Sequence, residues 1–245
     1  MTDTPATPAK AKLPWFWILP IPVALVLGIV IGMQIAGSGG AGPAPAAAVA
    51  PESPSEPEPS ATGQRINVER LDPGDPTAVG ALDAPVVMVT YSDYQCGYCA
   101  KWASESLPEL LEAYVDGGRL RIEYRDIMFF GENSRQSAEL AVAAGKQGKY
   151  QAFHDAIFAK GATAKDADYS EEGIKKLAQR IGVDAKRFVA DAEHADTAAL
   201  VQKNHDEASA LGVTGTPTFI VNGRPIIGAQ PLDVFVRAID EELGR

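Results

Sequence analysis

Two cysteines placed where a buried strand gives way to a helix restrict the possible folds of this chain more than any other feature. Residues 86–91 form a continuous, largely apolar run, the pattern of a strand that is buried on both faces of a sheet. The motif Cys96-Gly97-Tyr98-Cys99 follows, and from its last residue apolar side chains recur at intervals of three and four, which predicts a helix. Two glycines at 117–118 end this helix, and residues 120–125 alternate as a second strand. The result is a strand–helix–strand unit with the cysteines at its first junction.

The remainder of the domain predicts several helices, then a hairpin and a last helix. Helical patterns cover five segments, at 134–145, 149–159, 170–181, 184–192 and 196–211. Their expected amino-terminal caps are Ser170, Asp184 and Asp196. Residues 218–221 and 224–227 flank Asn222-Gly223, a pair that favours the tight turn of a β-hairpin, and Pro231 begins the final helix. The pattern predicts an α/β fold: a βαβ unit, a helical insertion at about 132–212, and a ββα unit.

The first 66 residues have a different chemistry. Residues 13–36 are almost wholly apolar, and no charged residue occurs between Lys12 and Glu52. About 20 apolar residues in a helix cross a hydrocarbon core of about 30 Å, so this segment is predicted to be one transmembrane helix. Lys10 and Lys12 precede it, and positive charge beside a membrane span stays on the cytoplasmic side. Residues 1–12 are therefore predicted to lie in the cytoplasm, and the chain after the helix on the outer side of the membrane. A cleaved signal peptide is the alternative, although its apolar core is usually only about 7–15 residues long.

Residues 37–66 form a linker that is rich in proline, alanine and glycine. The linker has no hydrophobic period and cannot bury enough surface to offset the entropy lost on ordering, so we expect it to be disordered. The folded domain then comprises residues 67–245.

Charge and cysteine content argue against two classes of function. The 32 acidic residues outnumber the 22 basic ones, whereas a nucleic-acid binder presents positive charge to phosphates. A zinc site would need ligands beyond the two cysteines, and His154, His194 and His205 stand apart on amphipathic helices, where we expect them to be surface groups. Neither a metal nor another cofactor is expected.

Three features together resemble the DsbA-like thioredoxin-fold disulfide oxidoreductases. They are the Cys-Gly-Tyr-Cys motif after a buried strand, the helical insertion, and the segment Gly-Thr-Pro-Thr-Phe at 215–219. The resemblance extends from about residue 83 to the carboxyl terminus, and it implies a thioredoxin-like fold with Cys96 and Cys99 as the catalytic residues. It also implies that Pro217 is a cis-proline opposite the cysteines and that the backbone of Thr216 binds an extended substrate.

The position of Cys96 explains its expected chemistry. Unpaired N–H groups and the helix dipole stabilise an anion at the amino end of a helix, which lowers the pKa of a thiol. A stabilised thiolate is a good leaving group, so a Cys96–Cys99 disulfide passes readily to another protein, with Cys99 as the resolving thiol. Gly97 and Tyr98 tune the balance between the disulfide and the dithiol. The family archetype has Pro-His at these positions, which can place a partial positive charge beside the thiolate. Tyr98 offers no such charge, so we expect this protein to be a weaker oxidant than the archetype. A static structural disulfide would close too short a loop to add much stability.

The family's buried proton acceptor lies six residues before the first cysteine, where this chain has Thr90. Proton transfer must then use water or another acid, for which Glu123 on the neighbouring strand is a candidate. The favoured interpretation of Glu123 is an ordinary ion pair with Arg121 or Arg125 on a solvated face.

These features favour a membrane-anchored oxidoreductase of the bacterial cell membrane, with an extracytoplasmic domain that introduces disulfides into exported proteins. An oxidase needs an electron acceptor, for which the resemblance implies a quinone-linked membrane protein of the DsbB or VKOR type. Two alternatives stay open: a reductase or isomerase with the same chemistry, and a non-catalytic envelope module that holds unfolded chains. The second alternative predicts that function survives when both cysteines are replaced by serine.

Overall fold

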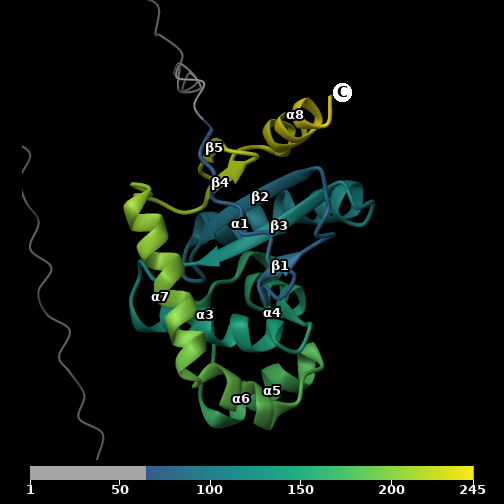
Figure 1. The fold of residues 1–245 in the computed structure, drawn as a ribbon. Helices are drawn as coiled ribbons and strands as arrows, with labels where there is room; N and C mark the ends of the chain where they lie inside the picture. The colour runs from purple at the N-terminus through teal and green to yellow at the C-terminus, as the bar shows by residue number, and fades with distance from the viewer. Residues whose placement is uncertain (1–64, 245) are drawn as a thin grey trace, which may run out of the picture. The chain divides into compact units, whose positions relative to one another are not determined.

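A five-stranded sheet organises residues 65–244, the part of the chain that the computed structural model describes (Figure 1). Its strand order is β1-β3-β2-β4-β5. The strands are β1 (Ala78–Val79), β2 (Val86–Ser92), β3 (Leu120–Asp126), β4 (Thr218–Val221) and β5 (Arg224–Ile227). β2 and β3 run parallel, whereas every other neighbouring pair is antiparallel. This topology confirms the predicted βαβ and ββα units.

The α-helices fall into two groups. Those of the two β-containing units are α1 (Gly97–Glu105), α2 (Leu107–Leu110) and α8 (Leu232–Glu242), and a π-helical turn, Leu111–Val115, follows α2. The inserted helices are α3 (Glu132–Gly145), α4 (Tyr150–Phe158), α5 (Glu171–Ile181), α6 (Ala185–Ala192) and α7 (Ala195–Ala210), with 3-10 turns at Ala159–Gly161 and Ala164–Asp166. Both ends of each inserted α-helix lie within two residues of the ends of a predicted segment. Figure 1 shows α3 to α6 gathered below the sheet and α7 running along its side.

Cap residues account for where the inserted helices begin. The side chains of Ser170 and Asp184 each accept a hydrogen bond from an N–H of the first turn, in α5 and α6 respectively, as predicted. The predicted cap at Asp196 is wrong, because His194 caps α7 instead: its ring nitrogen accepts the N–H of Asp196 at 3.2 Å. Asp196 lies within the first turn, where its negative charge suits the positive end of the helix dipole.

Helices cover both faces of the sheet. Met88 of β2 packs in a core that includes Trp102 of α1 and Phe235 of α8, whereas Val89 faces the opposite way and packs with Ala208 of α7. All seven residues of β3 are buried as well, so the predicted solvated face of this strand is wrong. α7 and the segment 65–77 cover the face of the sheet that carries Val89 and Glu123, here called the back of the sheet.

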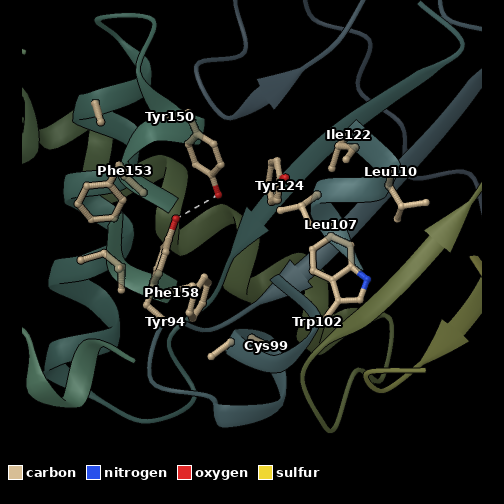
Figure 2. Close-up of a cluster of buried hydrophobic side chains, with 14 of the residues drawn as sticks. Tyr94, Cys99, Trp102, Leu107, Leu110, Ile122, Tyr124, Tyr150, Phe153 and Phe158 are labelled. Atoms are coloured by element: carbon tan, nitrogen blue, oxygen red, sulfur yellow. Dashed lines mark hydrogen bonds between the residues drawn. The ribbon is translucent and has the colours of Figure 1, made fainter. Parts of the chain in front are cut away.

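His154 requires a second correction, because it is buried rather than on the surface. Its ring centroid lies 6.1 Å from that of Tyr94, 5.2 Å from that of Tyr124 and 4.9 Å from that of Phe158. Burial disfavours the charged ring and therefore lowers the pKa of His154. Figure 2 shows neighbouring members of this aromatic cluster, among them Tyr94, Tyr124 and Tyr150.

The predicted hairpin turn joins β4 to β5. Asn222 and Gly223 have φ angles of 43° and 84°, the left-handed conformation that this tight turn requires of both residues. The Asn222 side-chain oxygen also accepts the N–H of Val87 at 2.8 Å, which ties the turn to the start of β2. Pro231 immediately precedes α8, as predicted.

The predicted cytoplasmic tail (1–12) and transmembrane segment (13–36) lie outside the described residues, as does all but the end of the linker (37–66). Within residues 65–244, no helix is long and apolar enough to cross a membrane. The anchor and the linker therefore stay predictions from the sequence.

Candidate active site

Cys96 and Cys99 lie together at the amino end of α1. The N–H of Cys96 donates to the carbonyl of Asp93 at 3.0 Å, and this turn joins the end of β2 to the helix. Cys96 is the N cap of α1, and its own carbonyl accepts the N–H of Ala100 at 3.1 Å. Cys99 is only 1% exposed, and both cysteines are free thiols. The structure thus brings together the two predicted catalytic residues, Cys96 buried at the start of the helix and Cys99 buried one turn further along it.

The surroundings of Cys96 stabilise its thiolate. The largest influence is a hydrogen bond from the Cys99 thiol, and the Thr216 side chain and the backbone N–H groups of Cys99 and Tyr98 act in the same direction. Together they outweigh the burial of the sulfur and lower the pKa of Cys96 to about 5. The helix-end N–H groups act as the sequence predicts, but the partner thiol contributes more.

The same surroundings act on Cys99 in the opposite direction. Burial raises the pKa of Cys99 well above that of an ordinary thiol, and the neighbouring Cys96 raises it further. Hydrogen bonds from the Ser92 hydroxyl and the Asp93 N–H oppose this effect without reversing it. At neutral pH the reduced protein therefore carries an ionised Cys96 and a protonated Cys99.

The loop before β4 lies against the sulfur of Cys96. The Thr216–Pro217 peptide bond is cis, as expected, and the sulfur of Cys96 lies 3.3 Å from the Thr216 carbonyl oxygen, to which the protonated thiol donates a hydrogen bond. The N–H of Gly228, after β5, donates to the Pro217 carbonyl at 2.8 Å and holds the loop from the other side. The sequence assigns Thr216 only to substrate binding, and its contact with a cysteine 120 residues away depends on the assembled sheet.

Gly97 and Tyr98 are exposed between the two cysteines. A Cβ atom added at Gly97 would meet nothing within 4 Å, so packing does not require glycine there. The Tyr98 side chain is 69% exposed, and it is the backbone N–H of this residue that acts on Cys96. Redox tuning by the side chain of Tyr98 stays a prediction.

Exposed apolar side chains lie at the same end of the sheet as the cysteines. Tyr91 pairs with Thr218, which pairs with Ile227, so β5 ends where β2 leads into the cysteine motif. β3 ends there too because it runs parallel to β2, and α7 leads into the loop of Pro217. The four large apolar side chains exposed at these element ends, here called the apolar rim, are Tyr98, Phe130, Leu211 and Ile227. Single apolar residues at element ends carry no periodic signal, so the sequence did not indicate Phe130, Leu211 and Ile227, and it indicated Tyr98 only as a redox-tuning residue.

Glu123 is a buried ion-pair residue on the back of the sheet, away from the cysteines. Its carboxylate contacts Arg125 at 2.7 Å and Arg121 at 3.1 Å, which confirms the predicted partners. It also accepts the N–H groups of Arg70 and Leu71, each at 2.9 Å, and it is fully buried rather than solvated. A carboxylate held by four donors on the far face of the sheet does not serve as the proton acceptor for Cys99.

Known proteins share this fold and part of this sequence. A family model described as thioredoxin matches residues 72–241. A Bacillus cereus protein named "Probable disulfide bond formation protein D" is 30% identical over 170 residues, covering 68% of this chain and 78% of that protein. The crystal structure of a thioredoxin-like oxidoreductase from Silicibacter pomeroyi, 30% identical, superposes with a TM-score of 0.60 over 71% of this chain and 95% of that one. BdbD from Bacillus subtilis shares the fold with a TM-score of 0.62 at 24% identity, over 70% and 94% of the two chains.

Proposed function

Because this chain belongs to the thioredoxin family and is a DsbA-like thiol–disulfide oxidoreductase, we propose that it oxidises cysteine pairs of exported proteins through a Cys96–Cys99 disulfide. The observation that carries the proposal is the contrast between the two thiols. The reduced protein gains stability from an ionised Cys96, and the disulfide form has no charge there to be stabilised. Interactions that favour the reduced form make the disulfide easier to reduce, so this disulfide oxidises other thiols.

Oxidation of a client takes two exchange steps. A client thiolate attacks the sulfur of Cys96, the Cys96–Cys99 bond breaks, and Cys99 leaves with the electron pair. A second client thiolate then attacks the client sulfur that is bonded to Cys96. The client disulfide closes, and Cys96 is released as a thiolate whose low pKa makes it a good leaving group. The client has lost two electrons, and the enzyme holds them as a dithiol.

Clients bind across the loop of Pro217 and the apolar rim. An extended client backbone adds to the backbone at Thr216, in the manner of strand addition. The rim offers exposed apolar contact, which suits unfolded chains of varied sequence. Client specificity is then broad, and the reacting cysteine is selected by its accessibility.

Location and recycling are parts of the same proposal. Residues 13–36 anchor the protein, residues 1–12 stay in the cytoplasm, and residues 37–66 let the domain reach its clients. The support is the apolar length and flanking charge of the sequence, together with the need of a disulfide donor for an oxidising compartment. Each cycle leaves a dithiol, so a quinone-linked membrane oxidase of the DsbB or VKOR type must oxidise it again.

Equilibration of the full chain in detergent with glutathione buffers tests the direction of exchange. We expect the Cys96–Cys99 potential to lie closer to about −120 mV than to about −270 mV. The comparison variant is Thr216→Val, which keeps the shape of the side chain but removes the hydroxyl that helps to lower the pKa of Cys96, so its potential should be more negative. A wild-type value near −270 mV would identify a reductase.

A further inference from the structure

A buried carboxyl group lies beside the cysteines, at the last position of β3. Asp126 is 1% exposed and is paired in register with Ser92, the last residue of β2. Residues paired in this way point to the same face of a sheet. Tyr124, two residues earlier on β3, packs in the core cluster that contains Cys99. Asp126 and Ser92 therefore share the face against which the cysteine helix packs.

Ser92 connects this carboxyl group to the buried thiol. Its hydroxyl acts on the Cys99 thiol, whose pKa it lowers against the larger effect of burial. Neighbouring strands lie about 4.8 Å apart, so the side chain of Asp126 begins one strand away from that hydroxyl. A serine hydroxyl donates one hydrogen bond and accepts others, which allows it to pass a proton between two neighbours.

The partners of Asp126 are neutral groups. The Tyr150 hydroxyl donates a hydrogen bond to the two carboxylate oxygens of Asp126, at 2.9 and 3.1 Å. The Tyr94 hydroxyl is hydrogen-bonded to that of Tyr150, as Figure 2 shows, and it also favours the ionised form of Asp126. The neighbouring Arg125 pairs with Glu123 on the opposite face. Burial with no cation at hand raises the pKa of Asp126 to about 7, and the nearby Asp93 and Asp75 add to the effect. Asp126 is thus an acid that gains and loses its proton near neutral pH.

Asp93 is the other buried acid near the cysteines, and its contacts assign it a structural role. Its carboxylate accepts the N–H groups of Gln95 at 2.8 Å and Phe129 at 2.8 Å, and the hydroxyl of Ser134 at 2.7 Å. These bonds fix the turn before Cys96 and the chain after β3. They occupy the carboxylate of Asp93, whereas among the described residues the hydrogen bonds to the Asp126 carboxylate come from tyrosine hydroxyls.

We propose that Asp126 exchanges a proton with Cys99 through the Ser92 hydroxyl, in place of the acid that residue 90 lacks. When the enzyme is re-oxidised, the Cys99 thiol gives its proton to Ser92 while Ser92 gives its own to the Asp126 carboxylate. The Cys99 thiolate then attacks the sulfur of Cys96, the Cys96–Cys99 bond forms, and the partner sulfur leaves as a thiolate. During client oxidation, Cys99 leaves as a thiolate and takes the proton back from Asp126 by the same route.

The inference rests on the proposed disulfide exchange and adds a pH dependence to it. Among the described residues, the titratable groups that act on or are influenced by Asp126 include Tyr150 of α4, Tyr94 and Asp93 of the turn after β2, Tyr124 of β3, and Asp75 of the amino-terminal segment. His154 of α4 contacts the rings of Tyr124 and Tyr150. Burial disfavours ionisation of His154 and of the three tyrosines. Closure of the Cys96–Cys99 bond should accelerate as pH rises through the pKa of Asp126, because only the ionised carboxylate accepts a proton.

The reaction of the reduced full chain with 5,5′-dithiobis(2-nitrobenzoate) separates the two cysteines. Attack by Cys96 releases one coloured thiolate, and closure of the Cys96–Cys99 bond then releases a second. In the wild type, the rate of the second phase should rise with pH through an inflection near 7. Asp126→Asn should slow that phase by about a hundredfold near pH 8, the scale of general acid–base catalysis, and remove the inflection.

Two further variants make the result decisive. Tyr150→Phe removes a hydrogen bond that favours the Asp126 carboxylate, so the inflection of the second phase should move to higher pH. Ser92→Ala should slow the second phase without moving the inflection. A second phase that keeps its wild-type rate and profile in Asp126→Asn overturns the role of Asp126. An unmoved inflection in Tyr150→Phe does the same, even if Asp126→Asn does not fold. A slow first phase in the wild type would instead contradict the proposed function, which needs a reactive Cys96.

Discussion

A Cys99→Ser protein is expected to lose turnover completely and to accumulate as mixed disulfides through Cys96. The serine hydroxyl introduced at position 99 can donate a hydrogen bond in place of the Cys99 thiol, and the helix-end N–H groups remain, so the sulfur of Cys96 stays reactive toward disulfides of clients and partners. The thiol that resolves the adduct is gone, and the covalent bond persists until an external thiol breaks it. Non-reducing gels of cells that express the full chain should show high-mass adducts that disappear with reductant.

Cys96→Ser is the matched control, because it should also lose turnover but form no adducts. The remaining Cys99 is buried and its pKa is raised, so it is neither accessible nor ionised at neutral pH. The double serine variant separates enzyme from binding module. If it still supported disulfide formation in cells, the chain would act as a non-catalytic module.

Replacement of Glu123 by glutamine is expected to destabilise the domain by about 3–5 kcal/mol, the usual cost of breaking a buried ion pair. Arg125 is completely buried, and its other carboxylate contacts are longer, 3.5 Å to Asp75 and 3.4 Å to Glu207, against 2.7 Å to Glu123. Without Glu123, a buried guanidinium loses its nearest counter-charge. Urea unfolding of the wild type and of Glu123→Gln measures the difference directly.

Glu172→Gln is the matched control for this prediction. Glu172 pairs with Lys176 at 2.8 Å, but both side chains are exposed, and such pairs contribute less than about 1 kcal/mol.

The stability that Glu123 adds should also depend on pH. Hydrogen bonds from the Arg70 N–H and from Arg125 outweigh the effect of burial and lower the pKa of Glu123. The stability that it adds is therefore present above its unfolded pKa of about 4.3 and is lost as pH falls through the folded value. Wild type and Glu123→Gln should converge in acid, and equal stability at neutral pH would contradict the account of this network.

Much of the fold follows from short stretches of sequence. The apolar run of β2, the caps at Ser170 and Asp184 and the Asn222-Gly223 turn are local signals, and each element forms where they predict it. A helix terminus is local too, so the lowered pKa of Cys96 was expected from its position. The cis bond before Pro217 was expected from the family resemblance and not from local physics.

Errors arose where segments distant in sequence come together. Glu123 was predicted to lie on a solvated face of β3. The alternation of polar and apolar residues in that strand does not reveal that α7 and residues 65–77 cover this face of the sheet. His154 was predicted to be a surface group because the sequence pattern of α4 does not show that its ring packs against Tyr94 and Tyr124. The position of Asp126 beside Ser92 likewise depends on the register of two strands, which no local pattern gives.

The measurement that tests the central claim most directly is the ionisation of Cys96 in the reduced full chain. Ultraviolet absorbance of the thiolate, followed from acid to neutral pH with Cys96→Ser as the blank, gives its pKa without any client or partner. We expect half-ionisation near pH 5. Half-ionisation near pH 8.5, the value of an ordinary cysteine, would contradict the claim that the fold holds this sulfur as an anion.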